Sequence, residues 1–172
     1  MRRAVFVSLI LLSAIACFSQ EGSRGPSTRA ERDRAVKITH ELEADPLSPR
    51  LRDDRDWLIK WIEDVPDITV SICPDPAVGE GRYRYSHELL LQKTFSSATY
   101  IIETSARDRN DLSVEAAGVE GALKAYEAII KKDPSARSEY WDRLLKKRAD
   151  GTLRDYVARY MEKVCGSEQT QT

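Results

Sequence analysis

At 172 residues the chain has room for one domain with short additions. Hydrophobic residues make up 41% of it and charged residues 32%, which is enough apolar material for a core and enough charge for a hydrated surface. The net charge of −1 provides no broad basic field, which argues against binding to nucleic acid or to an anionic membrane surface.

The N-terminus has the pattern of a secretory signal peptide, which we assign to residues 1–19. Met1–Arg3 is a short basic stretch, and Ala4–Ala16 is apolar apart from two serines. Small residues follow, as they do at a signal-peptidase cleavage site. The apolar stretch is too short to remain as a membrane anchor. We therefore expect a mature chain without a transmembrane segment, exported to the periplasm or the extracellular space.

The processing site has two interpretations. Cleavage after Ser19 leaves Gln20 as the first mature residue. Alternatively, Ser13–Cys17 resembles the lipobox of bacterial lipoproteins, although Ala14 stands where that pattern usually has leucine. Cys17 would then be acylated and would anchor the chain to a membrane, instead of being discarded with the signal peptide.

In either case the folded domain keeps two cysteines, Cys73 and Cys165. Two thiols in an oxidising compartment predict one disulfide. It would close a loop of about ninety residues, for which chain entropy gives an upper figure of roughly 4–5 kcal/mol. Metal binding and redox chemistry are the alternatives, but neither cysteine lies in a CxxC motif or has a histidine within four residues. We expect no cofactor and no metal.

The remainder is predicted to consist of a tether, one helical domain at residues 28–165 and a tail. Residues 20–27 are polar and rich in glycine and serine, which is typical of a flexible tether. Residues 166–172 are polar and are predicted to be disordered.

The first helix is predicted at Arg29–Ala44, because Thr28 followed by Glu31 has the spacing of a capping box. Its inner face is predicted to consist of Ala35, Ile38, Thr39 and Leu42.

A second helix is predicted from apolar residues that recur at three- and four-residue steps. Ser48 suits its N-cap and Pro49 its first position. Trp57 and Trp61 lie one turn apart on this helix, and we expect both in the core because large aromatic side chains bury much apolar area there. The stripe consists of Leu51, Leu58, Trp61, Ile62 and Val65.

The segment Pro66–Cys73 fits two structures. Ile68, Val70 and Ile72 alternate with polar residues, which is a strand pattern, yet they also extend the helical spacing of the preceding residues. The chain offers no second clear strand, and a lone strand leaves its backbone groups unpaired. We therefore favour a short helix.

Four more helices complete the prediction. A long one at His87–Thr104 follows Ser86 as its cap and is apolar around more than one face, which indicates a central position. The next, at Leu112–Lys132, carries small residues that would let a neighbouring helix approach closely. These are Ala117, Gly118, Gly121, Ala122 and Ala125. The last two are predicted at Pro134–Arg148 and from Thr152 to Cys165. The predicted fold is an all-α, compact bundle of five to six helices with one disulfide.

The stretch from Ala122 to Gly151 resembles part of a tetratricopeptide repeat, the second helix of one unit running into the first helix of the next. The positions that carry the resemblance are Ala122, Tyr126, Pro134, Trp141 and Leu144. The resemblance covers one incomplete unit, whereas such repeats need about three copies to bury a continuous core. It implies a groove for a protein or peptide. The candidate partner-binding residues are Tyr126, Tyr140 and Trp141.

Little in the sequence points to catalysis. His40 and His87 are the only histidines and so the obvious general bases, but each is followed by a glutamate that points elsewhere on a helix. GxSxG and HExxH motifs are absent from the sequence. We predict an exported, non-enzymatic helical protein that binds another protein or peptide. The alternatives are a tetratricopeptide-like scaffold, or a small exported hydrolase in which one histidine meets a nucleophile.

Overall fold

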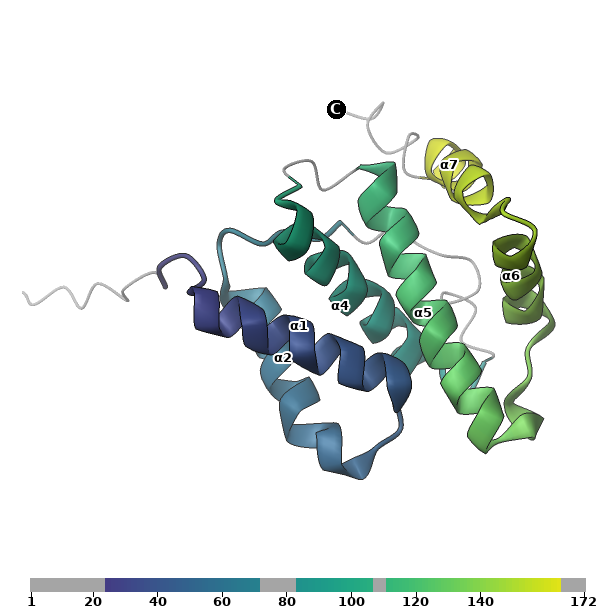
Figure 1. Ribbon diagram of the computed structural model, residues 1–172, viewed down its shortest axis with the longest axis horizontal. Coiled ribbons are helices and arrows are strands. Elements are labelled where there is room, and N and C mark those ends of the chain that lie inside the picture. Colours follow the sequence, from purple (N-terminus) through teal and green to yellow (C-terminus); the bar gives the residue numbers. More distant parts are fainter. Residues whose placement is uncertain (1–23, 72–82, 107–110, 165–172) are drawn as a thin grey trace, which may run out of the picture.

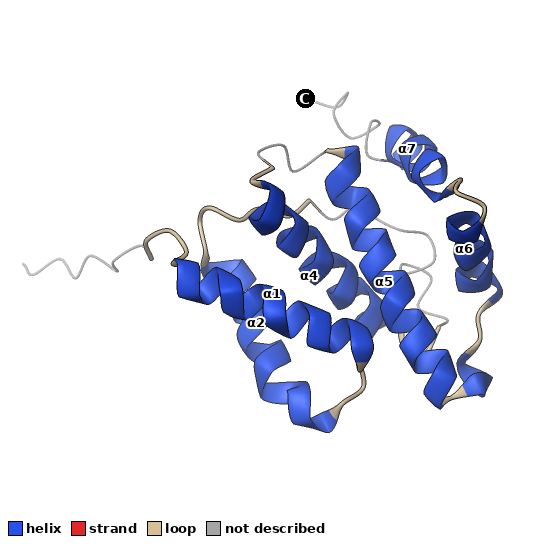
Figure 2. Cartoon of the chain, viewed as in Figure 1, coloured by secondary structure: helices blue, strands red, loops and turns tan. Residues whose placement is uncertain are grey.

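Helices α4 (Ser86–Thr104) and α5 (Leu112–Lys132) run antiparallel through the middle of the molecule (Figure 1). The computed structural model describes residues 24–71, 83–106 and 111–164, and every regular element in these segments is helical (Figure 2). The other elements are α1 (Arg29–Ala44), η1 (Pro49–Leu51), α2 (Arg52–Asp64), η2 (Pro134–Ala136), α6 (Glu139–Ala149) and α7 (Leu153–Val164). The prediction of an all-α bundle of five to six helices is confirmed, since the described residues form six α-helices.

Helix α1 has the predicted bounds and the predicted cap. The Glu31 backbone N–H donates to Thr28 Oγ1 at 3.3 Å, and the Thr28 backbone N–H donates to Glu31 Oε2 at 2.7 Å. This capping box satisfies two backbone donors that the helix itself leaves unpaired. The four residues predicted for its inner face are all buried: Ala35, Ile38, Thr39 and Leu42.

The predicted short helix at Pro66–Cys73 is wrong for residues 66–71. Helix α2 ends at Asp64, Pro66 and Asp67 form a turn, and residues 68–71 are neither helix nor strand. The Asp67 carboxylate explains the turn, because it accepts hydrogen bonds from the Ser27 backbone N–H and hydroxyl, both at 2.8 Å. It also pairs with Arg32 of α1 at 2.7 Å. These bonds tie the turn at Pro66–Asp67 to the start of α1. The chain therefore turns at Pro66, whereas a new helix was expected to begin there.

The helix predicted at Pro134–Arg148 begins later than expected. Pro134 opens the short 3-10 turn η2, and α6 starts only at Glu139. The Ser138 backbone N–H donates to the Tyr126 hydroxyl at 2.8 Å, which fixes the chain in an extended conformation just before the helix. Helix α6 ends at Ala149, one residue beyond the predicted end, and Gly151 just after it has the positive φ of 71° that glycine adopts without strain.

The core consists of two hydrophobic clusters on either side of the α4–α5 pair. The first joins α1, α2 and α4 with one residue of α5, and is built around Leu58, Trp61 and Phe95. The second joins α5, α6 and α7 with one residue of α4, and is built around Tyr126 and Trp141. Figure 1 shows the corresponding division, with α1 and α2 on one side of α5 and with α6 and α7 on the other.

Several sequence-based predictions fall outside the described residues. They are the signal peptide with Cys17, the first part of the tether, the tail and both members of the predicted Cys73–Cys165 disulfide. Among the described helices, none is both long enough and apolar enough to cross a membrane.

Candidate functional site

A layer of polar side chains crosses the centre of the bundle between the two hydrophobic clusters. Lys93 of α4 and Glu115 of α5 form an ion pair of 2.6 Å, with side chains only 4% and 5% exposed. Gln92 donates to the Thr39 backbone carbonyl of α1 at 3.3 Å and to the Ser96 hydroxyl at 3.0 Å. Buried polar groups are costly unless they are paired, and this layer provides the pairing.

Within this layer, Glu43 of α1 connects side chains of α1, α4 and α5. Its carboxylate accepts a hydrogen bond from Ser96 Oγ at 3.0 Å and pairs with Lys124 at 2.9 Å, and it contacts His40 Nδ1 at 3.2 Å. Burial raises the pKa of Glu43, but the hydrogen bonds from Lys124, His40 and Ser96 outweigh burial and hold the pKa below its ordinary value.

This layer does not contain the Ser–His–acid arrangement of a serine hydrolase. In a serine hydrolase the histidine lies between the serine and the acid, so that it can take the serine proton. Here the acid, Glu43, lies between Ser96 and His40. The second histidine, His87, is exposed in the first turn of α4. Within the described residues no group of three or more histidine, cysteine or acidic side chains could hold a metal ion.

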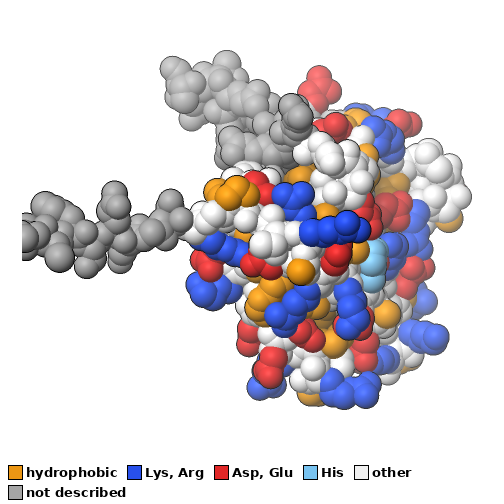
Figure 3. Space-filling view, turned by 60° about the vertical axis from the view of Figure 1, so that its left-hand side comes forward, with side chains coloured by type: hydrophobic (Ala, Val, Ile, Leu, Met, Phe, Trp, Pro, Cys, Tyr) orange, Lys and Arg blue, Asp and Glu red, His pale blue; other side chains and the backbone are white. Residues whose placement is uncertain are grey.

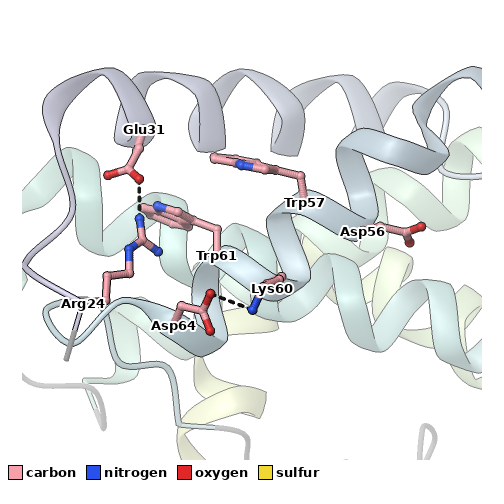
Figure 4. Close-up of a pocket in the computed structure, with 7 residues that line it drawn as sticks. All are labelled: Arg24, Glu31, Asp56, Trp57, Lys60, Trp61 and Asp64. Carbon is pink, nitrogen blue, oxygen red and sulfur yellow. Dashed lines mark hydrogen bonds and ion pairs between the residues drawn. The ribbon is translucent and has the colours of Figure 1, made fainter. Parts of the chain in front are cut away.

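Among the described residues, α2, the start of α1 and Arg24 before it line a surface groove of about 560 Å³ (Figure 4). Such a volume is within the range of small-molecule and peptide-side-chain sites. Its lining consists of Arg24, Glu31, Asp56, Trp57, Lys60, Trp61 and Asp64. We call this the indole groove.

Trp57 and Trp61 lie one turn apart on α2 and form the apolar wall of the groove. Their rings stack with centroids 5.8 Å apart and planes 18° apart. Trp61 is 2% exposed and belongs to the core, as predicted, whereas Trp57 is only half-buried. Arg34 of α1 covers Trp57, with its guanidinium carbon 3.9 Å from the ring centroid, and pairs with Asp54 at 2.9 Å.

Arg24 and Glu31 close the end of the groove beside Trp61. Figure 4 shows the Arg24 side chain rising alongside the Trp61 ring to pair with the Glu31 carboxylate. On α2, Lys60 pairs with Asp64 at 2.9 Å, while Asp56 points away from the other lining side chains. The indole N–H of Trp61 is buried and has no hydrogen-bond acceptor among the described residues.

The residues predicted to bind a partner lie elsewhere, and two of the three are in the core. Tyr126 is fully buried and Trp141 is 2% exposed, and their rings stack at 5.9 Å. The Tyr126 hydroxyl donates to Asp142 at 2.9 Å. Only Tyr140 is half-buried at the surface. In this structure the helix faces around Tyr126 and Trp141 therefore close into a core.

Sequence reasoning identified the tryptophan pair but missed the groove. Three further lining residues could have been found, because Asp56, Lys60 and Asp64 recur every four residues beside the tryptophans and so share their side of α2. Arg24 and Glu31 could not have been found, because they reach Trp61 only through the packing of α1 against α2.

Comparison of the chain with protein-family models, with curated proteins and with solved structures gives no match in any of the three cases. The charged surface gives no further direction, since Figure 3 shows acidic and basic side chains interspersed around small hydrophobic patches on the visible face.

Proposed function

We propose that this chain is an exported helical protein that acts by binding another protein or peptide, and that the indole groove is its contact site. One observation carries the proposal: a half-buried tryptophan, Trp57, stands at the rim of a groove of about 560 Å³ surrounded by charged side chains. Aromatic side chains that are neither fully buried nor fully solvated are enriched at binding surfaces, where a polar rim surrounds an apolar centre.

The burial of Tyr126 and Trp141 moves the proposed contact away from α5 and α6. A partner could reach these rings only by opening the second hydrophobic cluster. Binding in the indole groove would not open a hydrophobic cluster, because the groove is already an open volume at the surface.

Site-specific photo-crosslinking in cells that produce the native chain tests this proposal. A photoreactive amino acid at Lys60, on the groove, should give a discrete adduct with a partner. The same amino acid at Glu139, exposed on α6, serves as the control. With the partner identified and purified, Trp57→Ala should weaken binding by at least about tenfold, as for an aromatic hot spot. Absence of an adduct at position 60, or equal adducts at both positions, would contradict the proposal.

Export is a separate part of the proposal and has its own test. It is supported by the signal-peptide pattern of residues 1–19. The mature protein from an oxidising compartment should contain one Cys73–Cys165 disulfide. Peptide mapping without reduction should show the two cysteine peptides linked, and two free thiols would contradict this expectation.

A further inference from the structure

We propose that the Trp61 end of the indole groove recognises an arginine side chain of the partner, which takes the place of the protein's own Arg24. This inference rests on the proposed binding function, because it names the chemistry of the partner at that same groove. The geometry that leads to it is the pairing of Arg24 with Glu31 beside the Trp61 ring (Figure 4).

Where α1 packs against α2, an arginine pairs with a carboxylate beside an indole ring at two places. At Trp57, the Arg34 guanidinium lies 3.9 Å from the ring centroid and pairs with the Asp54 carboxylate. At Trp61, an arginine again meets a carboxylate beside an indole. A planar guanidinium suits both partners, because it stacks on aromatic faces and donates to carboxylates in a fixed geometry. The Trp61 end of the groove therefore already holds one guanidinium group, that of Arg24, while that of Arg34 covers Trp57 without lining the groove.

The charges of the groove favour a cation once Arg24 is displaced. The remaining lining then carries three acidic side chains against one basic side chain, Lys60. Lys60 is already paired with Asp64 at 2.9 Å, so Glu31 and Asp56 are left without a basic partner inside the groove. An incoming cation would restore the pairing that Glu31 now has with Arg24.

Arg24 is suited to be exchanged. It lies before the first helix, in a segment without regular structure, and its side chain is 31% exposed. Glu31 is its partner in the groove, and partly exposed ion pairs contribute little to stability. The next residue, Gly25, has no neighbour within 4 Å of where a Cβ would lie, and the hydrogen bonds to Asp67 that hold this segment begin only at Ser27.

Glu31 would stay in position when Arg24 leaves. Its second carboxylate oxygen accepts hydrogen bonds from the Thr28 backbone N–H at 2.7 Å and from the Thr28 hydroxyl at 2.9 Å. These bonds from Thr28, more than the charge of Arg24, keep the pKa of Glu31 below its ordinary value. The carboxylate is therefore ionised and preorganised before a partner arrives.

The Trp61 indole N–H is a second, independent feature that points to a ligand. It is buried at the end of the groove nearest Arg24 and Glu31, and it lacks an acceptor among the described residues. A buried donor without an acceptor is unfavourable. An arginine within a peptide offers both complementary groups, a guanidinium for Glu31 and a neighbouring backbone carbonyl for the indole N–H.

The test is a titration of the full mature chain with the blocked tripeptide acetyl-Gly-Arg-Gly-amide, followed through the indole N–H signals in two-dimensional NMR spectra. The same peptide with citrulline in place of arginine keeps the shape but removes the charge. Removing the internal competitor with Arg24→Ala should tighten binding by about fivefold. Arg29→Ala, at an exposed arginine on the first turn of α1, is the matched control and should leave the affinity unchanged.

A second pair of variants tests the acceptor in the Arg24→Ala background. Glu31→Gln should weaken binding by about tenfold. Glutamine retains the capping box, because its side-chain oxygen can still accept from the Thr28 N–H. Glu139→Gln on α6 is the control. Equal binding of the arginine and citrulline peptides, or no effect of Arg24→Ala, would overturn the inference. An adduct at position 60 together with a failed titration would leave the proposed function standing and remove only the arginine specificity.

Discussion

At the scale of single residues, Glu43 shows how one carboxylate holds three helices together. It belongs to α1 and binds Ser96 of α4 and Lys124 of α5. Its pKa is raised by burial but lowered further by its hydrogen-bond donors, so the net pKa lies below the ordinary value of 4.5. The folded state therefore binds fewer protons at Glu43 than the unfolded chain does near this pH.

The stability that ionised Glu43 contributes is fully present above its unfolded pKa of about 4.5, and it is lost as the pH falls through the lower folded pKa. Glu43→Gln should destabilise the protein by about 1–3 kcal/mol at pH 7, because a charged acceptor is lost. Urea unfolding at pH 7 and pH 3 should show that the difference from the wild type shrinks at pH 3.

Glu63→Gln, at an exposed position on α2, is the control for this experiment. It should be close to neutral at both pH values. A Glu43→Gln effect of equal size at pH 7 and pH 3 would show that the charge of Glu43 does not stabilise the fold.

At the scale of elements, the contact between α4 and α5 depends on two glycines. A Cβ added at Gly118 would lie 2.8 Å from the Lys93 backbone carbonyl, and one added at Gly121 would overlap the Ser96 side chain. The prediction that small residues here form a helix–helix contact is therefore confirmed for both. A larger residue at either position would push the two helices apart.

Gly121→Ala should lower the stability by about 1–3 kcal/mol, even though alanine favours a helix more than glycine does. The clash outweighs the helix propensity because Ser96 is itself held by Glu43 and Gln92. Thermal unfolding checks this, with Lys131→Ala at an exposed position of α5 as the control. A melting temperature of Gly121→Ala at or above the wild-type value would mean that α4 and α5 can separate at little cost.

The Lys93–Glu115 ion pair makes a second prediction for the same two helices. Removing one partner strands the other charge in the core, so Lys93→Met alone should cost about 3–5 kcal/mol. The double variant Lys93→Met/Glu115→Leu should recover much of that loss, because two apolar side chains replace two desolvated charges. A double-mutant cycle by urea unfolding measures the coupling. Additive effects of the two substitutions would contradict the prediction.

Features fixed by neighbouring residues were predicted from the sequence, whereas features fixed by contacts between distant residues were not. The start of α1 was predicted correctly because its capping box lies within four residues of sequence. The turn at Pro66–Asp67 was missed because the donor that fixes it, Ser27, is forty residues away. Periodicity likewise assigned Trp61 to the core but could not show that Arg24 and Glu31 would lie beside it. Local signals predict elements, whereas the groove depends on how distant elements pack.

At the scale of the whole molecule, the central helices α4 and α5 bury many more residues than the edge helix α7 does. Helices α4 and α5 contribute residues to both clusters, and they bury nine and ten residues respectively. Helix α7 lies at the edge and buries only Leu153 and Val157. Segments with few buried apolar contacts open locally at a lower free energy than the core does.

We therefore predict that the protein unfolds in stages when observed by native-state hydrogen exchange. Backbone amides of α7 should exchange at least about tenfold faster than those in the middle of α4 and α5, which corresponds to about 1.4 kcal/mol of local stability. Val157→Ala should widen this gap, because it removes apolar contact from a side chain that is 1% exposed. Protection in α1, on the other side of the central pair, should stay nearly unchanged, because Val157 belongs to the cluster formed by α5, α6 and α7. If Val157→Ala lowered protection equally in α7 and α1, the two clusters would be one cooperative unit and the staged opening would be wrong.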